Sequence, residues 1–121
     1  MAEVTAVYDA VASLPEIGKA FDNLIWIEMA GGPYGGIYKS AQEIVENVFL
    51  PLNADWDHFQ LAPQEFIETE NTIIMLGNYK GINRKTGKEL DARVAHVWKC
   101  DGEKLIFEQF TDTALFRALR S

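Results

Sequence analysis

The feature that most constrains the fold is the segment KELDARVAHVWKCDGEKLIFEQFTDT, which spans residues 88–113. On both sides of Cys-Asp-Gly at positions 100–102, β-branched and aromatic residues alternate with polar ones, a pattern typical of two long strands joined by a turn. A three-residue loop with Gly102 in the left-handed conformation of a G1 bulge pairs Lys99 with Glu103. The segment therefore predicts a β-hairpin, and we favour this register.

The register decides which polar side chains share a face of the hairpin. In the favoured register His96 lies opposite Ile106 and shares a face with Glu108 and Asp112. A two-residue loop places His96 opposite Phe107 and separates it from both carboxylates, because a slip of one residue exchanges the faces. The favoured register gives one imidazole and two carboxylates on an otherwise apolar surface, the composition expected of a small-molecule pocket.

Each of these polar residues also has a plain structural interpretation. His96 fits a half-buried strand histidine satisfied by a neighbour, and Glu108 fits a solvated or interface position. Asp112 is either the cap of a following helix or a pocket acid, and we predict the pocket role. In a flat sheet Asp112 is about 20 Å along the strand from His96, so a direct hydrogen bond between them requires a bulged or strongly curved sheet.

Length and composition limit the class of protein. A chain of 121 residues with 48% hydrophobic residues predicts one folded domain over residues 1–121. The net charge of −7 and the lack of a basic cluster argue against a nucleic-acid partner. The N-terminal sequence lacks the pattern of a secretory signal, and no apolar run approaches a membrane span, so no membrane partner and a cytoplasmic location are expected. Cys100 is the only cysteine, which excludes an intrachain disulfide.

The order of predicted elements indicates an α+β fold with helices on one face of a curved sheet. A capping box formed by Ser40 and Glu43 begins one helix, which Pro51 is expected to end. Pro63 marks an edge strand or a bulge. Periodicity predicts further helices over residues 3–13, 15–21 and 114–120, and strands over residues 24–29, 56–69 and 72–80, in addition to the hairpin.

The strands carry more large apolar residues than one small core is expected to hold. They include Ile73, Met75, Trp98, Ile106, Phe107 and Phe110. Exposed apolar faces of this size usually mark interfaces. We therefore predict a homodimer in which a second copy of the chain covers the outer face of the sheet.

Several catalytic motifs are absent from the sequence. It contains no Walker A pattern, no HExxH motif and no nucleophile elbow. With His58 and His96 as the only histidines, a dedicated zinc site would need unusual ligands. What remains is acid/base chemistry or ligand binding, without a metal or a cofactor.

Five segments between Trp26 and Leu119 together resemble the SnoaL-like proteins of the nuclear transport factor-2-like, ketosteroid-isomerase-like superfamily. They are GGPYGGIYKS, WDHFQLAPQEFI, LGNYKG, TGKELDARVAHVW and FEQFTDTAL. The resemblance implies a cone-shaped fold, with N-terminal helices packed on a strongly curved, mainly antiparallel sheet. In the polyketide cyclases of this family an aspartate at the end of the last strand acts as acid/base, and a histidine on the preceding strand lines the pocket. Asp112 and His96 are similar to these two residues.

The ketosteroid isomerases suggest two further positions. They use a tyrosine near the helices as an oxyanion donor, and Tyr8 is similar, although a core tyrosine is the alternative. The sequence has no clear match to the isomerases' base on the first strand, for which Glu28 is the nearest candidate. The residues expected to contact a substrate are Trp26, Tyr34, Trp98, Glu108, Phe110 and Tyr8.

Two functions of different class follow from these patterns. The favoured one is a small-molecule acid/base enzyme, an isomerase, cyclase or related lyase acting on an apolar carbonyl compound, with Asp112 and His96 as catalytic residues. The alternative is a non-catalytic ligand-binding or stress-associated dimer with the same pocket. A third possibility, an interaction domain that uses its sheet face, has no identified partner.

Overall fold

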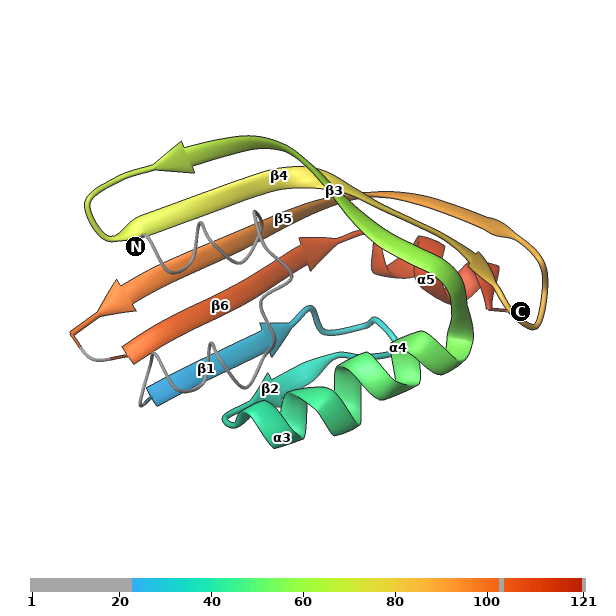
Figure 1. The fold of residues 1–121 in the computed structure, drawn as a ribbon, viewed down its shortest axis with the longest axis horizontal. Helices are drawn as coiled ribbons and strands as arrows, with labels where there is room; N and C mark the ends of the chain where they lie inside the picture. Colours follow the sequence, from blue (N-terminus) through green and yellow to red (C-terminus); the bar gives the residue numbers. More distant parts are fainter. Residues whose placement is uncertain (1–22, 103, 121) are drawn as a thin grey trace.

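A curved six-stranded sheet dominates the computed structural model, which describes residues 23–102 and 104–120 (Figure 1). The strand order is β2-β1-β6-β5-β4-β3, in which β1 runs parallel to β6 and the other neighbouring pairs are antiparallel. The bounds are β1 Asn23–Glu28, β2 Gly36–Tyr38, β3 Trp56–Glu68, β4 Thr72–Asn83, β5 Glu89–Asp101 and β6 Lys104–Thr111. The predicted α+β architecture with a mainly antiparallel sheet is confirmed. The two helices predicted before residue 22, and Tyr8 with them, lie outside the described residues.

Alternation along the strands gives the sheet one buried face. Every second residue is buried from Thr72 to Tyr79 in β4 and from Glu89 to Trp98 in β5, as the period-2 pattern of a half-buried strand requires. The parallel pairing of β1 with β6 aligns Trp26 with Phe107. The buried residues of β1, β6, β5 and β4 therefore all lie on the same face of the sheet. The largest side chains that are fully buried include Trp56, Trp98, Phe107, Ile44, Ile73, Met75 and Leu105.

Two irregularities in β3 bend the edge of the sheet. The pairing with β4 shifts between Asp57 and Gln60, where His58 has a φ of 54°, and shifts again between Pro63 and Glu65. Bulges of this kind bend a strand and increase its twist. The second shift brings the β3 backbone close to Gly77 of β4, where a Cβ would lie 2.5 Å from the carbonyl oxygen of Ala62. The prediction that Pro63 marks an edge strand or a bulge is confirmed on both counts.

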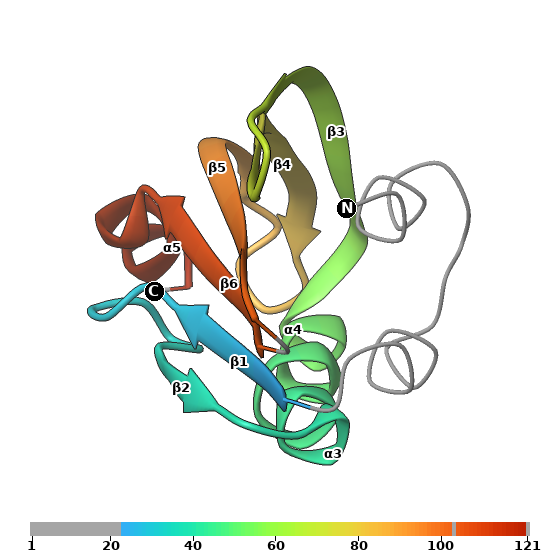
Figure 2. The same ribbon diagram turned by 90° about the vertical axis from the view of Figure 1, so that its left-hand side faces the viewer.

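A helical segment lies opposite the buried face of the sheet and consists of α3 (Ala41–Ile44), a π-helical turn (Val45–Phe49) and α4 (Leu50–Asp55) (Figures 1 and 2). Ser40 Oγ accepts from the Glu43 amide at 3.1 Å, which confirms the predicted start. The predicted end at Pro51 is wrong. The proline stands in the first turn of α4, directly after the π-helical turn, and the first turn is where a helix tolerates a missing N–H. The predicted C-terminal helix is α5 (Thr113–Leu119).

The favoured register of the β5–β6 hairpin is wrong. Gly102 has the expected positive φ of 62°, but β5 continues to Asp101, which pairs with Lys104. His96 consequently lies opposite Gln109, and Trp98 lies opposite Phe107. The favoured register would place Trp98 and Phe107 on opposite faces, whereas the observed register buries both of them. The free energy gained by burying two large aromatic side chains outweighs the preference of the turn sequence.

One row of residues across the outer face of the sheet is apolar except for Glu108. Across the six strands the row runs through Ile37, Ile27, Glu108, Val97, Ile74 and Ile67. Ile37 is 63% exposed and Ile67 is 44% exposed. Fewer large apolar residues lie outside the core than the sequence predicted. Four of those expected to be in excess are part of the single core: Ile73, Met75, Trp98 and Phe107. Among the described residues, no helix has the length and apolar character needed to cross a bilayer.

Candidate functional site

A cavity of about 220 Å³ lies between the helical segment and the buried face of the sheet. Its wall is mostly apolar and aromatic, and Trp26 stacks on Phe107 with ring centroids 3.8 Å apart. The first bulge of β3 turns Phe59 toward this space. The described lining residues are Trp26, Glu28, Val48, Phe49, Leu52, Phe59, Leu61, Tyr79, His96, Trp98, Phe107 and Gln109.

Glu28 places a carboxyl group in the wall of this apolar cavity. The residue is 5% exposed, and its Oε1 accepts from Trp26 Nε1 at 2.8 Å. Burial raises the pKa of Glu28 to about 7, and the Trp26 hydrogen bond opposes that rise only in part. The second carboxylate oxygen has no hydrogen-bond partner among the described residues. Glu28 is thus a carboxyl that exchanges a proton near neutral pH and has one oxygen left for a ligand.

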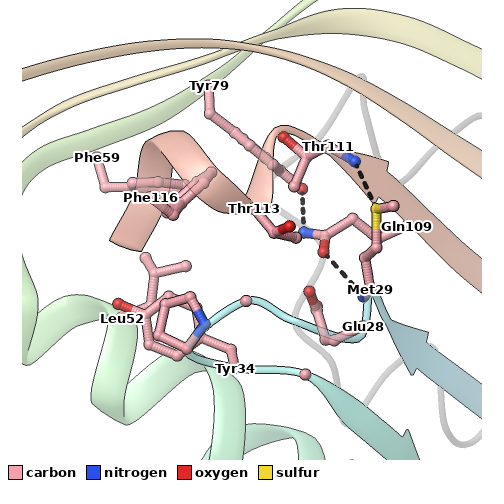
Figure 3. Close-up of a pocket in the computed structure, with 13 residues that line it drawn as sticks. Glu28, Met29, Tyr34, Leu52, Phe59, Tyr79, Gln109, Thr111, Thr113 and Phe116 are labelled. Carbon is pink, nitrogen blue, oxygen red and sulfur yellow. Dashed lines mark hydrogen bonds between the residues drawn. The ribbon is translucent and has the colours of Figure 1, made fainter. Parts of the chain in front are cut away.

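A chain of hydrogen bonds crosses the cavity wall from Met29, directly after β1, to His96 on β5. Figure 3 shows its part from Met29 to Tyr79. The Met29 amide donates to Gln109 Oε1 at 3.3 Å, and Gln109 Nε2 donates to Tyr79 Oη at 2.8 Å. Tyr79 Oη lies 2.6 Å from His96 Nε2. A backbone N–H only donates, so it fixes the Gln109 oxygen on the Met29 side and the amide NH₂ on the Tyr79 side. Tyr79 receives that hydrogen and donates its own to His96.

His96 is therefore a neutral hydrogen-bond acceptor. It is 7% exposed, and burial lowers the pKa of its imidazole to about 3. Accepting from Tyr79 at Nε2 requires the hydrogen of the neutral ring to be on Nδ1. This arrangement suits a residue that holds Tyr79 in place better than one that exchanges protons at neutral pH.

A smaller pocket of about 20 Å³ adjoins the cavity (Figure 3). The two spaces share Glu28, Leu52, Phe59, Tyr79 and Gln109 in their walls. Tyr34 closes the smaller pocket, donating to Asp55 Oδ2 at 2.7 Å and accepting from Trp56 Nε1 at 3.0 Å. Burial, together with its bond to the Asp55 carboxylate, raises the pKa of the Tyr34 hydroxyl well above its usual range. Tyr34 is thereby held as a neutral wall group.

The sheet opens beside Glu28 and Gln109. The parallel pairing of β1 with β6 ends at Ile27 and Glu108. Beyond this pair, side chains replace the backbone ladder: the Met29 amide bonds to the Gln109 side chain, and the Thr111 amide lies 3.3 Å from Met29 Sδ. Glu28 and Gln109 directly follow the last pair, Ile27 and Glu108. They are therefore neighbours on the inner face of the sheet, at the point where β1 and β6 separate.

The structure brings together only part of the predicted site. Trp26, His96 and Trp98 line the cavity, and Tyr34 lines the adjoining pocket. The prediction that His96 shares a face with Glu108 and Asp112 is wrong because of the register. Glu108 lies on the outer face with the 41%-exposed Phe110, and the exposed Asp112 caps α5, with its Oδ1 accepting from the Leu115 amide at 3.0 Å.

Sequence reasoning missed Tyr79, Gln109 and Phe59 and gave Glu28 only as a weak match. Alternation along β4 from Ile73 was a usable signal for Tyr79, since both are odd-numbered residues of one strand. Gln109 would have followed from the observed register. No local pattern in the sequence predicted that Phe59 lines the cavity. Alternation from Trp56 would place Phe59 on the outer face, and the bulge at His58 turns it to the inner face. Among the described residues, no cluster of three or more His, Cys, Asp or Glu side chains is placed to hold a metal ion.

The curved sheet with an apolar cavity on its helix-covered face defines a nuclear transport factor-2-like (NTF2-like) protein. The chain belongs to this family, since it is 40% identical to an NTF2-like protein of Burkholderia thailandensis, with a TM-score of 0.81 over 89% of this chain and 85% of that one. An NTF2-like protein of unknown function from Burkholderia pseudomallei is 25% identical, with a TM-score of 0.76 over 89% and 85% of the two chains.

A third solved structure shares the fold alone. It is a putative SnoaL-like polyketide cyclase of Shewanella denitrificans, 14% identical, with a TM-score of 0.62 over 88% of this chain and 83% of that one. Searches against family models and against curated proteins gave no match.

Proposed function

We propose that the protein is a small-molecule acid/base enzyme that moves a proton next to the carbonyl group of an apolar compound, with Glu28 as the acid/base residue. The observation that carries the proposal is the buried carboxyl of Glu28, whose pKa is raised to about 7 in a mostly apolar cavity. A base is most effective when its pKa lies near the working pH. The cavity supplies the other requirement, an apolar slot that excludes water from the reacting carbon.

The proposal moves the catalytic role from Asp112 to Glu28. Asp112 is exposed and already accepts a backbone hydrogen bond as a helix cap, so nothing desolvates its carboxylate. Glu28 has the burial that Asp112 lacks and stands next to the polar group of Gln109. His96, held neutral by burial, supports the wall of the site and does not exchange the proton.

The test uses 2-tetralone, a compact bicyclic ketone with acidic C–H groups beside its carbonyl. Exchange of these hydrogens for deuterium is followed by NMR with the wild type and with Glu28→Gln. We expect the substitution to lower the enzyme-dependent exchange rate by about 10²- to 10⁴-fold. Glu89→Gln, an exposed carboxyl at the start of β5, is the matched control. Equal exchange rates in the wild type and Glu28→Gln would refute the role of Glu28.

A non-catalytic ligand-binding protein is the second candidate. It is favoured by the involvement of Tyr79 and His96 in a fixed hydrogen-bond chain, which leaves Glu28 as the one cavity residue with a pKa near neutrality among those described. Binding of 2-tetralone to the wild type without any enzyme-dependent exchange would establish this reading.

We further propose that a second copy of the chain covers the outer face of the sheet. The support is the apolar row described above, in which Ile37 and Ile67 remain strongly exposed. Light scattering at micromolar concentration should give a dimer for the wild type. Val97→Arg, at the centre of the row, should give a monomer, whereas Leu50→Arg, an exposed apolar position on α4, should not. A wild-type monomer would refute the proposal.

A further inference from the structure

The amide of Gln109 has a fixed orientation in the cavity wall. Its oxygen faces the Met29 amide at 3.3 Å, and its nitrogen faces Tyr79 Oη at 2.8 Å. Exchanging the two ends would set the Gln109 NH₂ against the Met29 N–H, two donors face to face. The backbone therefore imposes which end of this side chain carries hydrogens.

The orientation leaves one N–H of Gln109 for a ligand. An amide nitrogen carries two hydrogens, and Tyr79 takes one of them. The second has no acceptor among the described residues, and Gln109 lines both the cavity and its adjoining pocket. This donor is only partly buried, but it faces the cavity. A ligand that displaces water from it favours an oxygen acceptor at that point, because a ligand without one leaves the donor unsatisfied.

Gln109 stands beside the carboxyl group of Glu28. The parallel register pairs Ile27 with Glu108, so the residues that follow them are neighbours on the inner face. A carbonyl oxygen that accepts from Gln109 would place the adjacent carbon close to Glu28. The Gln109 N–H thus matches a carbonyl oxygen, and the Glu28 carboxyl matches the C–H bond on the neighbouring carbon.

We propose that Gln109 is the specificity-determining residue of the cavity: it selects ligands whose carbonyl oxygen accepts its N–H, with the neighbouring C–H directed at Glu28. This inference rests on the cavity being the ligand site of the proposed function, and it names the substrate class as apolar ketones and related carbonyl compounds. Tyr79 and His96 are positioning residues, since they keep the Gln109 amide in this orientation.

The first test compares acetophenone with α-methylstyrene, which has the same shape but a C=CH₂ group in place of the carbonyl. Tryptophan fluorescence gives the dissociation constants, because Trp26 and Trp98 line the cavity. The readout is the ratio of the two dissociation constants, compared between the wild type and each variant. The difference in hydrophobicity between the two compounds contributes equally to every ratio and cancels in this comparison. The constants are measured at alkaline pH, where the carboxyl introduced by Gln109→Glu is ionised. The substitution then preserves the acceptor for the Met29 amide but removes the donor. It should shift the ratio against acetophenone by about 3- to 10-fold.

Gln60→Glu, an exposed position on β3, is the control and should leave the ratio unchanged. An unchanged ratio in Gln109→Glu overturns the proposal, as does failure of the wild type to bind either compound up to its solubility limit. Exchange of 2-tetralone hydrogens with no ratio shift overturns the selecting role of Gln109 alone. A ratio shift without exchange supports Gln109 and overturns only the proposed catalysis.

The second test needs no ligand. The fixed amide predicts that ¹⁵N NMR finds His96 as the neutral tautomer with hydrogen on Nδ1, in a His58→Gln background that leaves His96 as the only imidazole. In Gln109→Glu the Tyr79 hydroxyl turns to the new carboxylate, so His96 should then carry a hydrogen on Nε2. Hydrogen on Nε2 of His96 in the background protein would mean that the Gln109 amide is reversed, and would overturn the proposal.

Discussion

Replacing Glu28 by glutamine should make the protein more stable at alkaline pH while leaving its stability at acidic pH little changed. Burial raises the pKa of Glu28 from 4.5 to about 7, and the Trp26 hydrogen bond offsets only part of this rise. The native state therefore binds the proton more tightly than the unfolded chain, so stability falls as pH rises through this interval. Glutamine carries no charge and retains an oxygen that accepts from Trp26 Nε1.

The size of the effect follows from the two pKa values. Ionised Glu28 costs about 3 kcal/mol of folding free energy above pH 7, at about 1.4 kcal/mol for each pH unit between 4.5 and about 7. By the linkage relation, the wild type loses about 2.5 kcal/mol of folding free energy through this group between about pH 5 and pH 8. The stability difference between Glu28→Gln and the wild type should grow by that amount, in favour of the variant.

Urea unfolding followed by tryptophan fluorescence measures this difference at the two pH values under constant ionic strength. Glu89→Gln, which removes an exposed carboxyl at the start of β5, serves as the control for a change in net charge. A difference between Glu28→Gln and the wild type that is the same at both pH values would refute the buried ionisation. So would a difference that favours the wild type at the higher pH.

Three further substitutions test other parts of the structure. Gly77→Ala should destabilise by about 2 kcal/mol in urea unfolding, because its Cβ would meet the Ala62 carbonyl oxygen at 2.5 Å, whereas Gly81→Ala on the same strand meets only ordinary contacts. At the bulge, His58→Gly should be more stable than His58→Ala by about 1 kcal/mol, because the φ of 54° strains any residue with a Cβ. Asp112→Asn should change stability by less than about 0.5 kcal/mol and leave exchange of 2-tetralone unaltered, because asparagine caps a helix as well as aspartate does.

Much of the fold could be predicted because its signals are local. Alternation specified the long strands, and Ser40 and Pro63 marked a helix start and a strand bulge through their own hydrogen-bonding limits. The hairpin register could not be predicted from the turn alone. Cys-Asp-Gly suits several loops, and the deciding quantity is the joint burial of Trp98 and Phe107, which depends on both strands and on the layer above them.

The site was harder to predict than the fold because desolvation is not a local property. The sequence around Asp112 suits a pocket acid and a helix cap equally well, and the structure places the residue as a cap. Glu28 carries no distinguishing motif, and its character comes from burial beside Trp26. The alignment of Gln109 with Glu28 depends on the parallel pairing of β1 with β6, which joins segments some 80 residues apart and has no signature in either strand.

The most direct test of a catalytic carboxyl in the cavity is a ¹³C NMR titration of the Glu28 side chain, assigned by its absence in Glu28→Gln. We predict that the carboxyl carbon titrates with a pKa of about 7. Saturation with acetophenone should move this pKa further upward, because the ligand displaces water from the carboxylate and raises the cost of its charge. Titration near 4.5 in the free protein, the ordinary value for a glutamate, would contradict the assignment of Glu28 as the acid/base residue.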